Sequence, residues 1–552
     1  MSYSLGLQTL LVALLACHTV HTYPTECSFP EHWRGTWFQS NVHQEIRISD
    51  KEVSSKGNCT LASQQKYVVH NAVGRCYKCV IFYEKHVNVI QYKESFCNPD
   101  SKPPDLDFLC GHVNGDIQLY SMFRVNYRPI ACPLRGPFSF SYSRGHMLQE
   151  ECHQPNSRLE RCIHSYRMLF RYQACVDVVA SAEQSVEEME CLGMWKEGSA
   201  RYLVTRRVSP NIARHEDAFR CFIYERAKPQ EQPLLDYHLA ESAEATCSGL
   251  FSTSDGSTRL SLRRAPAARS RCRLPLWASG HRRWHSLDRA TSYQFNRNGT
   301  GLVVTGADQE THLECDRVVS EGARRALFVV RSTTGCMSGF QCMAFYRRDG
   351  HVMESQLGDV TRDAESACAR HNFARHKADY QTLVSSSQHH VVCPHLGQYS
   401  VTGQSRSARD PDDREGGDRD ERALTPEFSA LRVGCQSHDT IVLAGRVSDQ
   451  SRAFSCHGSW QENDTFYLVA SPRRHPWEST RHYCFVYSVA DDNLRFSRVM
   501  RTCSRAVRPG VEGELTFNVT ARAECLTSSA RRWRPVLSPL LLSVAAAVLV
   551  RR

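Results

Sequence analysis

The residues best able to do chemistry in this 552-residue chain are its 25 cysteines. A thiol can close a disulfide, bind zinc or act as a nucleophile, and spacing separates these uses. A cysteine triplet recurs four times at similar spacing, and a further cysteine stands ahead of each triplet. The sixteen positions are Cys27, Cys59, Cys79, Cys97, Cys132, Cys191, Cys221, Cys247, Cys272, Cys315, Cys342, Cys368, Cys393, Cys456, Cys484 and Cys503. We therefore predict a tandem array of four cysteine-rich modules.

The number of cysteines favours disulfides. Setting aside Cys17, in an apolar N-terminal segment, leaves 24, an even number that allows twelve bridges and indicates an oxidising compartment. Their connectivity stays open. Zinc is the rival interpretation at Cys76-Tyr77-Lys78-Cys79 and at His389-His390-x-x-Cys393-x-His395, but no second Cys-x-x-Cys stands at zinc-ribbon spacing. We expect no metal and no cofactor.

The elements that position the cysteines are predicted to be strands. Each middle cysteine opens an aromatic and aliphatic run, as in Cys221-Phe222-Ile223-Tyr224, and a second run such as Tyr202-Leu203-Val204 precedes it. Turn residues are frequent and long helical periodicity is scarce. The predicted fold class is mainly all-β, with four antiparallel β-barrel or sandwich modules stapled by disulfides. One short exposed helix is expected at Ser181–Glu190, where glutamates cluster.

The opening cysteines set the predicted boundaries. The segments are a signal peptide (1–22), module 1 (23–131), module 2 (132–271), module 3 (272–392), module 4 (393–526) and a C-terminal segment (527–552). Each module has the usual size of a domain. Residues 403–427 are predicted to be a disordered insert, because apolar residues almost vanish there. Modules 2 and 4 share Cys-x-Gly-x-Trp-x-Glu, starting at Cys191 and Cys456, which indicates duplication.

The opening strand of module 1 contains Trp33-Arg34-Gly35-Thr36-Trp37. Gly35 and Trp37 resemble the Gly-x-Trp opening of lipocalin-type barrels. The resemblance implies a tryptophan that closes the barrel floor and a cavity for a small apolar ligand. Weaker echoes are Gly136-Pro137-Phe138 and Gly397-Gln398-Tyr399. A buried structural tryptophan in a solid module is the alternative interpretation.

Both chain ends indicate secretion. The apolar run Leu5–Ala16 is typical of a signal peptide, and a mature protein would begin near residue 23. Cys17 also suits a bacterial lipoprotein box, which fits poorly with the glycosylation sequons. The apolar tail Val536–Val550 is shorter than the roughly 20 residues of a membrane-spanning helix. It suggests a GPI-anchor signal with attachment at Ser528 or Ser529, and a short single-pass helix is the alternative. Either anchor places the modules on the extracellular face of the plasma membrane.

Surface features follow from the same compartment. Four sequons predict glycosylation at Asn58, Asn298, Asn463 and Asn518. The net charge is +10, and eight arginines without an acid fill residues 259–283. We predict a binding patch for an anionic glycan, lipid or acidic protein there, with a solvated hinge as the alternative. Its residues are Arg263, Arg264, Arg269, Arg271 and Arg273.

Taken whole, the chain resembles uncharacterised arthropod secreted or membrane-anchored proteins with four consecutive cysteine-rich domains of unknown function. The resemblance covers Cys27 to Cys525. It rests on Trp-Arg-Gly-Thr-Trp at residues 33–37, the Arg75-Cys76-x-x-Cys79 segment, the Cys-Phe-[Ile/Val]-Tyr strands and the hydrophobic tail. It implies an architecture and no activity, so no catalytic residue is transferred.

Enzyme motifs are absent from the sequence: it has no Gly-x-Ser-x-Gly, no His-Glu-x-x-His, no phosphate loop and no dinucleotide fingerprint. We therefore predict a non-enzymatic cell-surface protein that binds an extracellular protein or glycan and no nucleic acid. A carrier or receptor for small apolar ligands in lipocalin-like barrels is the second hypothesis. A structural protein of the extracellular matrix or cuticle is the third.

Overall fold

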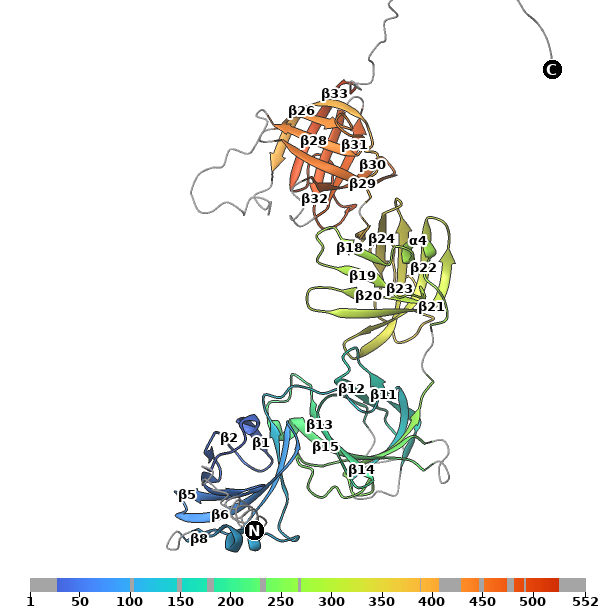
Figure 1. Cartoon of the computed structure of the whole chain (residues 1–552). Helices are drawn as coiled ribbons and strands as arrows, with labels where there is room; N and C mark the ends of the chain where they lie inside the picture. The colour runs from blue at the N-terminus through green and yellow to red at the C-terminus, as the bar shows by residue number, and fades with distance from the viewer. Residues whose placement is uncertain are drawn as a thin grey trace, which may run out of the picture. The chain divides into compact units, whose positions relative to one another are not determined.

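The computed structural model describes residues 27–525, apart from residues 100–103, 146–150, 176–182, 229–234, 267–269, 388, 407–427, 446–450, 474–480 and 491–492. The chain divides into two compact units, residues 1–269 with 333–338 and residues 270–332 with 339–552. Modules 1 and 2 lie in the first unit and modules 3 and 4 in the second, apart from the hairpin tip 333–338 (Figure 1). The predicted signal peptide, Cys17 and the anchor segment with Ser528 and Ser529 lie outside the described residues.

Module 1 is a ring of eight antiparallel strands with a short ninth strand, β8, paired to β6. The ring order is β1-β2-β3-β4-β5-β6-β7-β9, and the β9–β1 pairing closes it. The elements are η1 (Glu31–Trp33), β1 (Gly35–Gln39), β2 (Ile46–Ile48), β3 (Glu52–Val53), β4 (Gly57–Ser63), β5 (Lys66–Asn71), β6 (Cys76–His86), β7 (Val89–Glu94), β8 (Asn98–Pro99), α2 (Leu106–Gly111) and β9 (Tyr120–Arg124).

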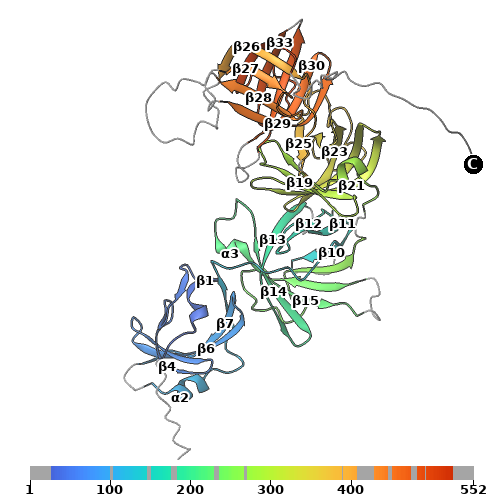
Figure 2. The same cartoon turned by 45° about the horizontal axis from the view of Figure 1, so that its top comes forward.

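Modules 2, 3 and 4 are closed barrels whose eight strands pair in chain order (Figure 2). Module 2 consists of β10 (Phe138–Arg144), β11 (Cys152–Arg161), β12 (Arg167–Tyr172), β13 (Ser185–Glu197), β14 (Ala200–Arg207), α3 (His215–Ala218), β15 (Phe219–Arg226), β16 (Tyr237–Glu241) and β17 (Thr258–Arg264). Module 3 consists of α4 (Leu276–Ser279), β18 (Arg283–Ser286), β19 (Ser292–Phe295), β20 (Gly301–Thr305), β21 (Glu310–Glu321), β22 (Arg325–Thr334), β23 (Met337–Arg347), β24 (Val352–Leu357) and β25 (Gln381–Ser385). Module 4 consists of β26 (Gly397–Arg406), β27 (Phe428–Val433), β28 (Thr440–Gly445), β29 (Arg452–Glu462), β30 (Thr465–Pro472), β31 (Tyr483–Ala490), β32 (Asn493–Val499) and β33 (Leu515–Ala523).

The prediction of all-β barrels or sandwiches is confirmed, and the modules are barrels. Closed eight-stranded up-and-down rings are the arrangement of lipocalins, and closure leaves no free strand edge. Alternation along the strands fills each interior: Met168, Phe170 and Tyr172 of β12 join the core cluster of module 2. Of the alternate residues, Arg167 and Arg171 are half-buried and Leu169 packs with Cys162 and Cys336.

Two local predictions are wrong. The helix expected at Ser181–Glu190 is the start of β13, where the glutamates meet arginines on neighbouring strands: Glu188 lies 2.8 Å from Arg167 and Glu187 lies 3.1 Å from Arg207. These cross-strand ion pairs favour the extended chain. The first four residues of the predicted disordered insert, 403–406, extend β26 because β33 offers them pairing partners. The rest of the insert lies outside the described residues.

All sixteen predicted cysteines are oxidised, and the structure contains twelve disulfides. The opening cysteine of each module pairs with the first of its triplet: Cys27–Cys59, Cys132–Cys191, Cys272–Cys315 and Cys393–Cys456. In modules 2 to 4 the middle cysteine pairs with the third: Cys221–Cys247, Cys342–Cys368 and Cys484–Cys503. Module 1 departs from this scheme with Cys76–Cys97 and Cys79–Cys110. The remaining bridges are Cys152–Cys175, Cys162–Cys336 and Cys435–Cys525. Cys97 is therefore not the counterpart of Cys247, and Cys110 takes that place.

In the first unit, the shared Cys-x-Gly-x-Trp-x-Glu motif of module 2 packs against module 1. A Cβ on Gly193 would lie 2.9 Å from Val89 Cγ2, so a larger residue would force the two strands or the valine side chain to shift. The buried Asn88 donates to the Leu192 carbonyl at 2.8 Å. Glu197 pairs with Lys85. The rings of Phe38 and Phe219 stack at 5.2 Å within an apolar cluster formed by both modules.

The second unit repeats this junction between modules 3 and 4. A Cβ on Gly458 would lie 2.7 Å from Val352 Cγ2. Val352 opens β24 as Val89 opens β7. Glu462 lies 2.6 Å from Arg348, in the place of the Glu197–Lys85 pair. The motif that the sequence shows as a mark of duplication is therefore the contact by which each even-numbered module docks onto the module before it.

Candidate functional site

The predicted barrel motif of module 1 is a packed floor. Trp37 is fully buried, and its indole Nε1 donates to the Trp33 carbonyl in η1 at 2.8 Å. The Arg124 guanidinium covers the ring at 4.3 Å and donates to the carbonyls of Arg34 and Val87. Gly35 has φ +131°, and a Cβ there would lie 3.1 Å from Arg124. Gly35 and Trp37 thus form this floor together with η1 and Arg124.

Module 3 has the same floor without the same sequence motif. Trp284 on β18 is buried, and its Nε1 donates to the Ala278 carbonyl of α4 at 2.8 Å. Arg282 stands two residues before it with φ +57°, in the place of Gly35. The Gly-x-Trp pattern misses Trp284 because an arginine adopts the left-handed conformation expected of glycine.

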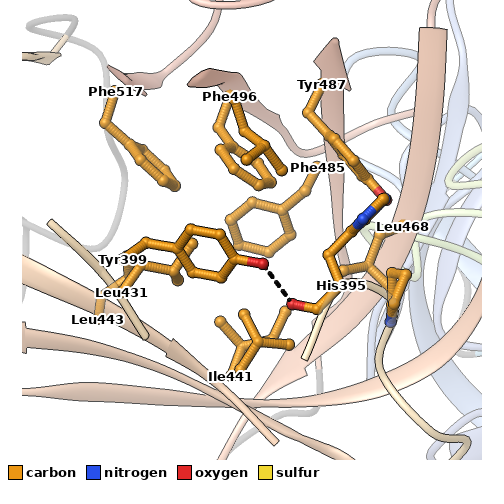
Figure 3. A pocket seen from close by; sticks show the side chains of 13 residues that line it. His395, Tyr399, Leu431, Ile441, Leu443, Leu468, Phe485, Tyr487, Phe496 and Phe517 are labelled. Atoms are coloured by element: carbon orange, nitrogen blue, oxygen red, sulfur yellow. Dashed lines mark hydrogen bonds between the residues drawn. The ribbon is translucent and has the colours of Figure 1, made fainter. Parts of the chain in front are cut away.

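The interior of module 4 holds a small apolar cavity (Figure 3). Its volume is about 20 Å³, which is close to the space of one water molecule. One wall is a stack of aromatic rings, with 4.8 Å between the centroids of Tyr487 and Phe496 and 5.0 Å between those of Phe496 and Phe517. Tyr399, one of the predicted echoes of Trp37, faces the stack and donates its hydroxyl proton to the His395 carbonyl at 2.9 Å. This barrel is filled by its own side chains.

One end of the module 2 barrel carries a buried ionic network. Arg207 lies 3.1 Å from Glu187 and 3.2 Å from Glu241. Arg144 covers the buried ring of Tyr172 at 4.1 Å. Burial and the neighbouring Glu187 raise the pKa of Glu241 to about 7, against the opposing effect of Arg207. Arg220 also acts on Glu241, so three arginines face two glutamates in this network.

The feature best suited to recognition is a surface cleft of about 180 Å³ in module 1. We call it the module 1 cleft. Its lining residues are Ser95, Phe96, Cys97, Asn98, Phe108, Leu109 and His112. Phe96 is 83% exposed and Phe108 is 58% exposed, although large aromatic side chains usually lie inside. Two exposed phenylalanines beside one cavity form an apolar patch of the kind that marks a contact surface.

Both walls of the module 1 cleft are held by disulfides. Cys97 ties the segment beside β8 to Cys76, and Cys110 in α2 is tied to Cys79. Both partners lie on β6. Asp105 caps α2 by accepting the Phe108 N–H at 3.0 Å. The cleft is therefore fixed to the barrel wall and needs little ordering before it binds.

The predicted arginine patch is divided between the two units. Arg263 and Arg264 lie in the first unit and Arg271 and Arg273 in the second, all four exposed, whereas Arg269 lies outside the described residues. Arg264 is engaged by Asp236, whose carboxylate accepts its backbone N–H at 2.7 Å. The described members of the predicted patch therefore belong to two separate units.

The four glycosylation sequons differ in how exposed their asparagine side chains are. Asn58, Asn298 and Asn463 are exposed, as glycosylation requires. Asn518 is half-buried on β33. Cys59, beside Asn58, is bridged to Cys27.

Within the described part of the chain, no three histidine, cysteine, aspartate or glutamate side chains are grouped so as to hold a metal ion. The thiols of the sequence-level zinc alternative, Cys76, Cys79 and Cys393, are oxidised. None of the helices described has the length and apolar character to cross a bilayer.

Comparison with known families gives four consecutive matches. They are domain of unknown function (DUF7044) at residues 25–114, domain of unknown function (DUF7042) at 128–264, domain of unknown function (DUF7043) at 268–382 and domain of unknown function (DUF7045) at 427–509. The resemblance to four consecutive domains of unknown function is thereby confirmed, without any indication of an arthropod source. The chain matches no curated protein and no solved structure.

Proposed function

We propose that this chain of four consecutive domains of unknown function is a non-enzymatic, extracellular recognition protein that binds a protein partner through the module 1 cleft. The observation that carries the proposal is the pair of exposed phenylalanines beside a cavity whose walls are fixed by two disulfides. The twelve disulfides suit the extracellular side of the cell, and membrane anchorage through the C-terminal segment remains part of the proposal.

The size of the cleft favours a protein partner over a small molecule. Pockets for drug-sized ligands span roughly 300–1,000 Å³, whereas the module 1 cleft measures about 180 Å³. A space of this size accepts one apolar side chain. Protein interfaces concentrate their binding energy where one such anchor enters a desolvated pocket lined by aromatic residues. Phe96 and Phe108 would form the walls around that anchor, with His112 and Asn98 as polar neighbours.

The test is binding of the multimerised, secreted protein to a panel of cells and recombinant ectodomains. Changing Phe96 and Phe108 together to serine should weaken binding at least tenfold, because the loss of one hot-spot aromatic already costs about 2 kcal/mol or more and a tenfold change corresponds to about 1.4 kcal/mol. The matched control is Phe251→Ser in module 2, which removes a phenylalanine of 81% exposure that does not line the cleft. Equal binding by the double variant and the control would exclude the cleft as the contact.

A carrier of small apolar ligands is the second candidate, and the cavity of module 4 is the observation that favours it. Its lining is almost wholly apolar, with an aromatic wall opposite Leu431 and Leu443 (Figure 3). A ligand would have to displace the side chains that now reduce the free space to about 20 Å³. Native mass spectrometry and lipid extraction decide between the candidates, because a carrier retains stoichiometric lipid and a solid barrel is empty.

A further inference from the structure

A chain of histidines follows the junction of modules 3 and 4. His281 lies ahead of β18, His351 in the turn before β24, His389 and His390 in the linker, and His457 and His482 on or beside β29 and β31. The ring centroids of His281 and His351 are 4.8 Å apart, and those of His351 and His389 are 4.4 Å apart. The ring of His457 lies 5.2 Å from His390 and 4.8 Å from His482.

Two of these rings are buried in the junction. His457 is 4% exposed, and its nitrogens contact the His389 carbonyl at 2.9 Å and the Ser471 hydroxyl at 2.7 Å. His482 is 8% exposed, and its Nδ1 has no hydrogen-bond partner among the described residues. The backbone N–H of His482 donates to the Leu287 carbonyl of module 3 at 2.9 Å, so this residue is itself a contact between the two modules.

We propose that the junction of modules 3 and 4 is an acid-sensitive joint, in which protonation of His457 and His482 opens the contact between the two barrels. A proton on either ring would place a positive charge beside another buried imidazole, in a site closed to water. The junction relieves this charge by letting the modules separate, since each barrel is closed and disulfide-bonded on its own.

The surrounding groups increase this effect. Those facing the two rings are His285 and Arg289 from β18 and the turn after it, His351 ahead of β24, His389 and His390 from the linker, and Asp439 ahead of β28. Behind them lie His281, Arg283, Arg347 and Asp349. Asp439 and Asp349 are the two acids in this set, and Asp439 is engaged by the Ser437 and Thr440 hydroxyls. Cations and imidazoles therefore outnumber acids around the rings.

The direction of the pH effect follows from burial. Burial lowers the pKa of His457 to about 4, against the opposing effect of its hydrogen bond to the His389 carbonyl, and burial together with the neighbouring His457 lowers the pKa of His482 to about 3. The closed junction thus binds fewer protons than the open one below the ordinary histidine pKa of about 6.5. Closure is fully stable above this pH and weakens as the pH falls toward 4. At pH 5.5 each ring lowers the closing constant about tenfold, or about 100-fold together. Endosomes reach such a pH.

Hydrogen exchange of the full-length protein, followed by mass spectrometry at pH 7.4 and 5.5 and corrected for intrinsic rates, tests the joint. The reporter is the peptide that contains the His482 amide. We expect its protection to fall about 100-fold at pH 5.5 in the wild type and to change less than threefold in the His457→Gln/His482→Phe variant. His371→Gln, an exposed histidine of module 3, should behave as the wild type.

Three results would overturn the proposal. The wild type could keep the same protection of the His482 peptide at pH 7.4 and 5.5, or the double variant could lose as much protection as the wild type. The third is a loss of protection at pH 5.5 that appears in the His371→Gln control and not in the wild type. Should the double variant fail to fold, His482→Phe alone should show only the roughly tenfold acid effect of His457. A full 100-fold effect in that single variant would assign the opening to other groups.

Discussion

The junction of modules 3 and 4 also contains a buried carboxylate whose removal should weaken the contact between the two barrels. Glu354 on β24 is fully buried and accepts from Arg505 Nη2 of module 4 at 2.7 Å and from Arg348 Nε of module 3 at 2.6 Å. Thr382 Oγ1 lies 3.3 Å away. The Arg505 guanidinium also stacks on Tyr380 at 3.9 Å. Glu354 thus joins arginines of both barrels, as Glu462 of module 4 also does.

Changing Glu354 to Gln keeps the shape and removes the charge. Breaking a buried ion pair by removing one partner costs about 3–5 kcal/mol. Because Glu462 still lies 2.7 Å from Arg505 in the variant, we expect about 3 kcal/mol, at the low end of that range. A domain of 150–250 residues loses about 2–4 °C in Tm per kcal/mol. The transition of modules 3 and 4 should therefore fall by about 6–12 °C.

Differential scanning calorimetry of the full-length protein measures this shift. The matched control is Glu365→Gln, which removes a carboxylate of 78% side-chain exposure that pairs with Arg317 in the same module. Exposed pairs contribute about 0–1 kcal/mol, so the control should shift the transition by at most about 4 °C. Equal shifts in the two variants would refute the claim that Glu354 holds the barrels together.

Further predictions concern the buried Glu241 of module 2, the docking glycines and the arginine patch. Burial raises the pKa of Glu241 to about 7, so the folded state binds a proton that the unfolded state releases, and stability falls as the pH rises from about 4.5 to 7. Glu241→Gln should therefore stabilise module 2 by about 3 kcal/mol at pH 8 and by little at pH 4, as followed by thermal unfolding. Gly193→Ala and Gly458→Ala should each lower the free energy of unfolding by about 1–3 kcal/mol, because the added Cβ meets Val89 or Val352. Gly350→Ala, with open space around its Cβ, is the control. A loss of stability in only one of the two glycine variants would contradict the equivalence of the two junctions. Changing Arg263, Arg264, Arg269, Arg271 and Arg273 together to serine should abolish retention on heparin at 0.15 M salt; unchanged retention would remove the arginine patch from consideration.

The sequence predicts those parts of the fold that depend on residue type and spacing alone. The recurring cysteines and the aromatic runs after Cys79, Cys221, Cys342 and Cys484 are enough to give four β modules. In module 1 the sequence takes Cys97 as the third cysteine of the triplet, and this assignment is wrong because a disulfide depends on distance in space. β8 brings Cys97 beside Cys76, and α2 brings Cys110 beside Cys79. Trp284 was missed because Arg282 takes the left-handed position of Gly35.

The candidate site was less accessible to sequence reasoning. In the sequence, Phe96 and Phe108 look like ordinary core residues of a cysteine-rich segment. In the structure both are exposed, on segments that two disulfides fix to β6. The histidines of the acid-sensitive joint come from separate segments of the chain, so the sequence does not show that the junction brings them together. The arginine patch had the clearest signal in sequence, yet its members fall in two units.

The repeating unit of this protein is a pair of barrels rather than one barrel. The odd-numbered modules, 1 and 3, share a helical turn followed by a buried tryptophan whose indole donates back to that turn. The even-numbered modules, 2 and 4, share the docking glycine and a tryptophan stacked on the following Tyr-Leu-Val strand, at 5.0 Å for Trp195 and 5.2 Å for Trp460. The two kinds of module fit together, because Val89 or Val352 of the odd-numbered module packs against the docking glycine of the even-numbered one. Duplication of a pair explains why modules 2 and 4 are closest in sequence. The pairs then diverged in chemistry, because a lysine and an asparagine lie at the first junction where an arginine network and the histidine row lie at the second.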